Sequence, residues 1–287
     1  MTAPSPGTNP PPALLPGPDD LPDLRAVIAT DEAASAAQAL VDEHLATGEP
    51  RHVGSLTDEE LVVCTGSVDG ARPTGRWYDT LGETPRRIAE TAALRSLTSR
   101  EELLLIMRGE EVDVSISDRL TALLRLRASA PLMTAQAMTR EGPTWYLLRR
   151  CGDAWLREVV SASGLHTHDL VRLGDDEELF LRGFLLLLDH NVASDLTALH
   201  QPGGGAPPPG EVVSFLTTQR HVTQLALVHP PDDAVEALVV CVDETGATTL
   251  GVTDGEGVTY RGAAPEAILD RWRTWRDGRE QTAGTDV

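Results

Sequence analysis

The chain has 287 residues, with 44 acidic and 24 basic side chains and a formal net charge of −20. Hydrophobic residues make up 41% and charged residues 24%, a balance that predicts a packed globular core and excludes wholesale disorder. A charge of −20 repels nucleic acid and anionic membranes, so contact with either needs a local basic face.

All 24 basic residues are arginine. Schiff-base chemistry, a Walker A phosphate loop and Ser-x-x-Lys acyl enzymes are therefore excluded, because each needs a lysine amine. Scarce isoleucine and asparagine indicate a high-GC genome. The N-terminus has no basic start followed by an apolar segment, and apolar runs such as residues 184–188 are far shorter than the ~20 residues that span a bilayer. We expect a cytoplasmic protein without membrane contact.

The composition along the chain predicts five segments. Prolines and glycines dominate both the start of the chain and one internal stretch, and such residues have little apolar surface to bury. The segments are a disordered Pro-rich tail (1–23), an N-terminal α+β half (24–200), a Gly/Pro linker (201–210), a C-terminal α+β half (211–277) and a second disordered tail (278–287).

Helix signals are clearest in the first half, where polar caps precede apolar faces. The expected helices are residues 31–48 with Asp31 as the cap, residues 84–99 with Thr84 as the cap and Pro85 as the first helical residue, and residues 117–127 capped by Ser117 or Asp118. A short apolar run, 103–107, separates the last two. A fourth helix, apolar nearly all round and therefore buried, is predicted over residues 176–189.

Short segments with β-branched and aromatic residues, separated by turn residues, predict strands. In the first half they cover residues 133–138, 145–150, 155–160 and 165–171; in the second half they cover 212–216, 222–228, 237–242, 248–252 and 258–261, followed by a helix over 265–275. Both halves run from strands into one helix, which indicates an internal duplication of architecture. The predicted fold class is α+β, with antiparallel strands in two β-rich halves.

The segment around His166 and His168 is the first candidate for chemistry. On a strand both imidazoles point to one side, and such a pair can bind zinc or another divalent metal. His190 and His200 are further candidate ligands by composition only. Two histidines on a sheet face without a ligand are the commoner arrangement, and we favour it. We assign no catalytic, cofactor-binding or metal-binding residue.

The three cysteines, Cys64, Cys151 and Cys241, are too scattered for a disulfide framework. Apolar neighbours predict that Cys64 and Cys241 are buried thiols in core strands, whereas Cys151 follows two arginines at a turn. Neighbouring aromatic residues, Trp77-Tyr78 and Trp145-Tyr146, place one ring in the core and one outward, where it can contact a protein partner. Most such rings are nevertheless partly covered core residues.

Arginines are frequent from Arg86 to Arg127, where helix–strand–helix followed by two strands is compatible with a winged helix. In that arrangement Arg119, Arg125 and Arg127 would face DNA. Glutamates and aspartates alternate with these arginines, which favours a solvated face with salt bridges. A DNA-binding regulator is therefore the alternative to a protein-binding role, and a metal-dependent enzyme at His166 and His168 is third.

The order Ala92-Ala93-Leu94-Arg95-Ser96-Leu97, Val112-Asp113-Val114 and residues 120–126, followed by a strand series, resembles EspG-type proteins. Residues 237–246 and 265–272 resemble the closing strand–turn–strand–helix of that family. Its members are cytoplasmic chaperones of the actinobacterial type VII (ESX) secretion system. The resemblance covers residues 84–275 in layout; residues 76–83 have no counterpart in it, and no substrate-binding residue is carried over.

The resemblance implies a quasi-twofold α+β arrangement and a role in holding a helical secretion substrate. Together with the two β-rich halves and the acidic composition, it leads us to expect a non-enzymatic, cofactor-free cytoplasmic chaperone or adaptor with a protein partner. The sequence leaves the identity of the partner, the recognition surface and the oligomeric state open.

Overall fold

The computed structural model describes residues 24–65, 78–108, 111–139, 142–203, 207–229 and 232–283. The predicted tail 1–23 lies outside these ranges, and so do residues 284–287 of the predicted tail 278–287. The helices of the described ranges are α1 (Arg25–Ile28), α2 (Asp31–Thr47), α3 (Asp58–Thr65), the 3-10 helix η2 (Tyr78–Thr80), α4 (Glu83–Ser99), α5 (Asp118–Arg127), α6 (Asp175–Phe184), α7 (Gly210–Thr217) and α8 (Pro265–Ala283).

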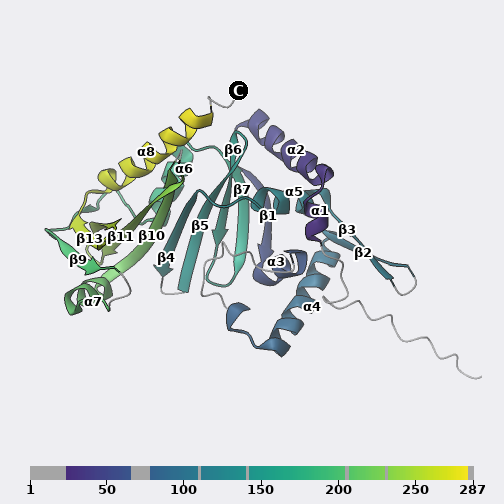
Figure 1. Cartoon of the computed structure of the whole chain (residues 1–287), viewed down its shortest axis with the longest axis horizontal. Helices are drawn as coiled ribbons and strands as arrows, with labels where there is room; N and C mark the ends of the chain where they lie inside the picture. The colour runs from purple at the N-terminus through teal and green to yellow at the C-terminus, as the bar shows by residue number, and fades with distance from the viewer. Residues whose placement is uncertain are drawn as a thin grey trace, which may run out of the picture.

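The strands form one large sheet and one separate hairpin (Figure 1). The hairpin pairs β2 (Leu103–Arg108) with β3 (Glu111–Ile116). The large sheet contains β1 (Arg51–Thr57), β4 (Met133–Thr139), β5 (Gly142–Cys151), β6 (Ala154–Val160), β7 (Leu165–Val171), β8 (Val192–Ala193), β9 (Leu199–Pro202), β10 (Gln219–His229), β11 (Ala234–Asp243), β12 (Ala247–Asp254) and β13 (Gly257–Gly262).

The strand order of the large sheet is β1-β7-β6-β5-β4-β10-β11-β12-β13-β9, and every pairing along it is antiparallel. Only the short β8 pairs in parallel, with β12. Outward from the central β4–β10 pair, each side has four strands in chain order and then an earlier strand at the edge. The expected α+β fold with antiparallel strands is therefore confirmed, as one continuous sheet.

The two faces of this sheet are covered differently. One face packs against α6 and α8 around a shared core that includes Trp272 and Trp275, both buried. The opposite face is covered at one end by the helices of the first half and at the other end by α7 (Figure 1). Between those ends, strands β4, β5, β10 and β11 carry the candidate functional site.

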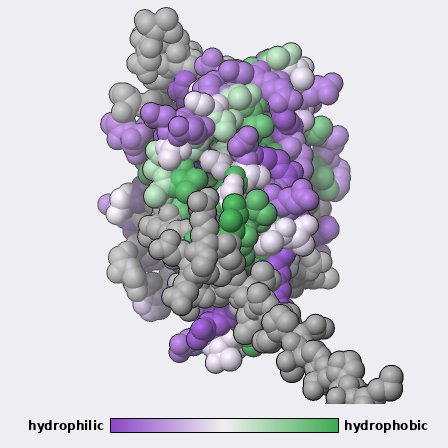
Figure 2. All heavy atoms as spheres, turned by 90° about the vertical axis from the view of Figure 1, so that its right-hand side faces the viewer, coloured by the Kyte–Doolittle hydropathy of each residue, from purple (hydrophilic) through white to green (hydrophobic). Residues whose placement is uncertain are grey.

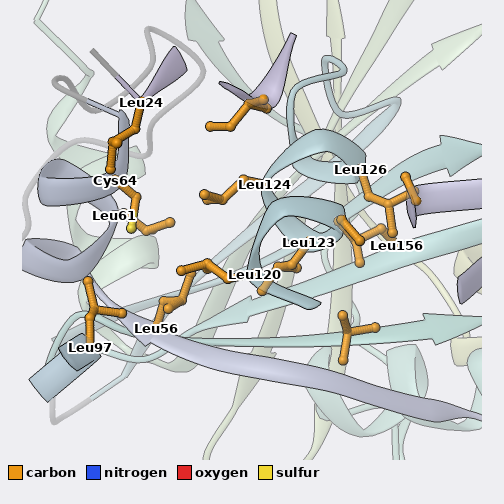
Figure 3. Packing of buried hydrophobic residues seen from close by; sticks show 14 of the residues in the cluster. Leu24, Leu56, Leu61, Cys64, Leu97, Leu120, Leu123, Leu124, Leu126 and Leu156 are labelled. Atoms are coloured by element: carbon orange, nitrogen blue, oxygen red, sulfur yellow. The ribbon is translucent and has the colours of Figure 1, made fainter. Parts of the chain in front are cut away.

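The core of the first half consists mainly of leucines from helices and strands far apart in the sequence (Figure 3). Leu61 and Cys64 of α3 face Leu120 and Leu124 of α5, and Leu156 of β6 closes the cluster. All of these side chains are buried. Their burial positions α3 and α5 over the sheet and over the charged residues described below.

Several helix boundaries confirm the predicted signals. Helix α2 ends at Gly48, which has a left-handed φ of 75° that suits glycine. Helix α5 begins after Ser117, whose hydroxyl accepts a hydrogen bond from the Leu120 N–H at 3.1 Å. Two caps were predicted wrongly by one or two residues: Thr30, not Asp31, caps α2, and α4 begins after Gly82 without a side-chain cap.

The predicted strand over 212–216 is wrong, because these residues lie in α7. Its β-branched and aromatic side chains favour a strand locally. Val212, Phe215 and Leu216 are spaced as on one helical face, however, and they pack with Tyr260 of β13. Burial of that face stabilises the helix relative to a strand.

The thiol of Cys64 is buried as predicted, but in helix α3 and not in a strand. A capping box starts this helix: the Thr57 N–H donates to Glu60 Oε2 at 3.0 Å, and the Glu60 N–H donates to Thr57 Oγ1 at 3.3 Å. The spacing Thr-x-x-Glu in the sequence is a local signal for the start of this helix.

Two further helices differ in length from the prediction. Helix α6 ends at Phe184 and is not buried all round, since Leu179 is 70% exposed and only Glu177 and Leu181 are buried. Helix α8 continues through residue 278 to Ala283, where a loose tail was expected. The proposed division into halves and linker stays a prediction. Among the described helices, none combines the length and apolar character needed to cross a membrane.

Candidate functional site

A groove of about 400 Å³ crosses the middle of the sheet, on the face opposite α6 and α8. Strand alternation brings every second side chain of four neighbouring strands to this face. In the register of β4 with β10, Gln136 lies opposite Gln224, and Val239 of β11 lies beside Gln224. Trp145 and Leu147 of β5 continue the floor. The groove thus draws on both halves of the chain.

The described lining of this groove contains no charged side chain, although 24% of the chain is charged. Alanine, valine and leucine alternate with threonine and with the two glutamine amides. Met138 and Val235, on the same face by strand register, are 51% and 63% exposed. An uncharged groove bordered by exposed apolar side chains is typical of a surface that contacts another molecule.

Exposed apolar residues also occur at the end of the molecule that carries the β2–β3 hairpin. Figure 2, which views this end, shows apolar atoms gathered within a mainly hydrophilic surface. Leu104 and Ile106 on β2 and Ile88 on α4 are exposed there. Leu104 and Ile106 lie two residues apart on β2, and Ile88 lines a shallow pocket along α4.

The predicted histidine pair lies in a buried network on the groove's face of the sheet, beneath α3 and α5. His166 and His168 point to the same side of β7, as predicted, and their stacked ring centroids are 6.2 Å apart. Glu158 of β6 lies between them, with its Oε1 2.6 Å from His166 Nδ1 and 3.6 Å from His168 Nε2. On the other side, His166 Nε2 is 2.8 Å from Asp58 Oδ1. All four side chains are buried.

Two arginines complete the network around Glu158. Arg127 Nε donates to Glu158 Oε1 at 3.1 Å, and Arg149 Nη1 donates to Oε2. Burial by itself would raise the pKa of Glu158, but the two guanidiniums and the hydrogen bonds from both histidines hold it well below its usual range. Burial lowers the pKa of His168, and the nearby Glu158 carboxylate opposes that shift. Glu158 is therefore an ionised carboxylate at neutral pH.

Glu158, His166 and His168 are the one group of possible metal ligands found in the described ranges. The arrangement suits a buried ion-pair network better than a metal, because both nitrogens of His166 face carboxylates and Glu158 already binds two guanidiniums. His190 and His200 do not join this group: His190 is exposed in the turn before β8, and His200 Nδ1 lies 3.2 Å from Thr259 Oγ1 on β13.

Most arginines predicted to face DNA are engaged elsewhere. Arg127 is buried against Glu158, Arg119 pairs with Glu102, and Arg100 Nη2 is 2.8 Å from Glu60 Oε1. Arg125 is exposed at the end of α5. Of the interleaved acidic residues, Glu102 thus forms an ion pair with an arginine of this region, as the charge pattern suggested.

The three cysteines are free and buried. Burial raises the pKa of Cys64 and of Cys241 to about 12 and that of Cys151 to about 11, so none is a ready thiolate. Trp145 and Tyr146 point to opposite faces of β5 and both are buried, which is the commoner arrangement for such rings, and neither ring is exposed to contact a partner. Trp77 lies outside the described residues.

The groove and the roles of Glu158 and Asp58 were not predicted from the sequence. Asp58 precedes His166 by 108 residues, so no local spacing connects them. Alternation along β6 does place Glu158 with Leu156 and Val160, and a charge on a buried face was the available signal. The groove had no local signal, because its lining comes from strands of both halves.

No family model and no curated protein matches this sequence. Among solved structures, the chain is similar to the type VII secretion system chaperone EspG5 of Mycobacterium tuberculosis, solved in complex with a PE25–PPE41 dimer. The two are 12% identical, with 65% of this chain and 84% of that chain covered and a TM-score of 0.40. This is the family that the residue order resembles.

Proposed function

We propose that this chain is a non-enzymatic, cytoplasmic protein-binding chaperone or adaptor whose central groove holds a helical segment of its partner. The single observation that carries the proposal is the uncharged groove across β4, β5, β10 and β11 in a strongly acidic chain. The resemblance of the residue order to EspG-type proteins defines the partner we propose, a helical substrate of a type VII secretion system.

The chemistry of the groove favours an amphipathic helix over a charged ligand. A charged group placed there would lose water without gaining an ion pair from the described lining. An apolar helix face has no charge whose hydration would be lost. It gains contact with Val239, Leu147 and the exposed Met138. Methionine side chains adapt to different apolar partners.

The two glutamines add a specific element at the centre of the groove. Gln136 and Gln224 are directly opposite each other on β4 and β10, and Gln224 is exposed. Each amide can donate and accept a hydrogen bond. We therefore propose that the partner helix places one polar, uncharged side chain against this pair and apolar side chains on either side of it.

We further propose that the two halves are related by a quasi-twofold axis through the β4–β10 pair. The support is the strand order, in which β4-β5-β6-β7-β1 on one side corresponds to β10-β11-β12-β13-β9 on the other. In both halves the edge strand precedes the others in the chain. The glutamine pair lies where this axis would cross the sheet.

The test adds a positive charge to the groove of the tagged full-length chain. Gln224→Arg changes an exposed side chain at the groove centre, and Ala226→Arg is a second variant two residues further along β10. Leu179→Arg is the matched control, because it adds the same charge at an exposed position on α6, on the opposite side of the sheet. Purification from the native host with mass spectrometry, followed by titration with the identified partner, measures the effect.

We expect the wild type and Leu179→Arg to retain a helical partner in equal amount, and the groove variants to bind it at least about tenfold more weakly, since a charge there must be desolvated. Equal binding by all variants would overturn the proposal. Nucleic acid in place of a protein, lost when Arg125→Ala is introduced, would instead establish the DNA-binding alternative. Elemental analysis of the same preparation tests for metal at Glu158, His166 and His168.

A further inference from the structure

A second pocket, of about 390 Å³, lies at the end of the sheet away from the groove. Three arginines line it: Arg150 at the end of β5, Arg172 after β7, and Arg279 near the end of α8. Trp155 forms an aromatic wall, and Asp153 is the acidic side chain of the described lining. Figure 1 shows the ends of α2 and α8 close to β6 at the top of the molecule.

This concentration of positive charge is unusual in a chain with a net charge of −20. Elsewhere in the structure arginines bind carboxylates, as Arg127, Arg149 and Arg273 do. By contrast, Arg150 and Arg172 form no ion pair with any residue in the described ranges. Three guanidiniums line the pocket with the Asp153 carboxylate, and Asp233 acts on Arg279 from nearby, so a net positive charge remains at neutral pH.

The hydrogen bonds of Arg150 and Arg172 within the described ranges use few of their donors. Arg150 Nε donates to the Gly152 carbonyl oxygen at 3.2 Å, and Arg172 Nη2 donates to the Leu45 carbonyl oxygen at 2.7 Å, at the end of α2. Arg279 donates to the Val228 carbonyl oxygen. These contacts stabilise a turn and a helix end, and they orient the guanidiniums. A guanidinium has five N–H donors, so Arg150 and Arg172 keep donors for a ligand.

The electrostatics within the pocket agree with this geometry. Burial lowers the pKa of Arg279; Asp233 opposes that shift, and the neighbouring positive charge of Arg150 adds to it. Arg150 and Arg279 are thus close enough to repel each other. An anion between them would relieve the repulsion.

We propose that this pocket binds a small molecule through a phosphate or other multivalent oxyanion, held by Arg150 and Arg172 with Arg279 beside them. Planar guanidiniums bind phosphate and carboxylate oxygens in pairs, which suits this chemistry. A volume of about 390 Å³ accommodates ligands from inorganic phosphate to a mononucleotide. The site is separate from the groove, so it is independent of the protein-binding function proposed above.

The test measures binding of pyrophosphate, adenosine monophosphate and citrate to the full-length protein by calorimetry, with thermal unfolding as a second readout. Sodium chloride at the same sodium concentration is the salt control, because cations alone stabilise an acidic protein. The variants are Arg150→Gln and Arg172→Gln. Arg261→Gln, an exposed arginine on β13 outside the pocket, removes the same charge and is the matched control.

We expect at least one phosphate probe to bind the wild type and Arg261→Gln equally, and to bind each pocket variant about tenfold more weakly. Citrate binding with the same dependence on Arg150 and Arg172 would assign the site to carboxylates as well, within the oxyanion class. Equal affinity in all variants would overturn the proposal, as would stabilisation by the probes no greater than that by sodium chloride.

Discussion

The two halves of the sheet share a strand order but fill the same face with different chemistry. In the first half, Glu158 and His166 form a buried ionic network beneath α3 and α5. In the second half, Val212, Cys241 and Tyr260 form an apolar cluster beneath α7. The uncharged groove lies between them.

Strand pairing and the packing of the core are therefore determined separately. The antiparallel ladder is made by backbone groups, which every residue except proline supplies in the same way. Side chains then have to fill the space under the helices, and either satisfied charges or apolar groups can do so. The ionic network is more sensitive to substitution than the apolar cluster, because removing one charge leaves its partner buried and unpaired.

The largest effect is expected for Glu158→Gln, which removes the carboxylate from the ionic half. Arg127 and Arg149 would then lose the buried carboxylate that both bind, at a cost of about 3–5 kcal/mol in the free energy of unfolding. Cys241→Ala in the apolar half removes one buried sulfur and should cost about 1 kcal/mol. Denaturant unfolding of both variants measures the contrast, and a smaller loss for Glu158→Gln than for Cys241→Ala would contradict it.

A smaller effect is expected for Gly251→Ala, which tests packing in the apolar half. A Cβ at this position would lie 2.9 Å from two ring atoms of Tyr260, so the ring must shift. Overpacking of this kind costs about 1–3 kcal/mol. Gly255→Ala is the control, since its Cβ would meet no atom within 4 Å. Equal unfolding midpoints for the two variants would show that the cluster around Tyr260 is loosely packed.

The smallest expected effect is the change of folding stability with pH, and both halves contribute to it. Burial lowers the pKa of His168 in the first half and of His221 in the second, each from an ordinary value of 6.5. The unfolded chain therefore takes up protons below about pH 6.5 that the folded chain does not, and stability falls as the pH decreases through this range. Glu158 adds its own loss only below its ordinary pKa of 4.5.

The contribution of each half to this pH dependence is measured from unfolding free energies at about pH 7.5 and about pH 5.5. The proteins compared are the wild type, His168→Gln and His221→Gln. Each substitution should reduce the difference between the two pH values. A wild-type stability that rises on acidification over this interval would mean that the two imidazoles are charged in the folded state.

Local signals in the sequence predicted much of the fold. The strand over 165–171 matches β7, and Gly48 and Ser117 end and begin helices where expected. The common side of His166 and His168 followed from strand alternation. Residues 212–216 were predicted wrongly, because their β-propensity is opposed by burial of a helical face against Tyr260.

By itself, the sequence determined the net charge, the exclusion of lysine chemistry, the α+β class and the positions of most elements. Only the tertiary structure decided that β4 pairs with β10, that Asp58 and Glu158 surround His166, and that an uncharged groove and an arginine pocket lie at separate places on one sheet. The physical reason is range: caps and periodicity act over a few residues, whereas these arrangements depend on strands whose pairing is selected by the packing of the whole chain.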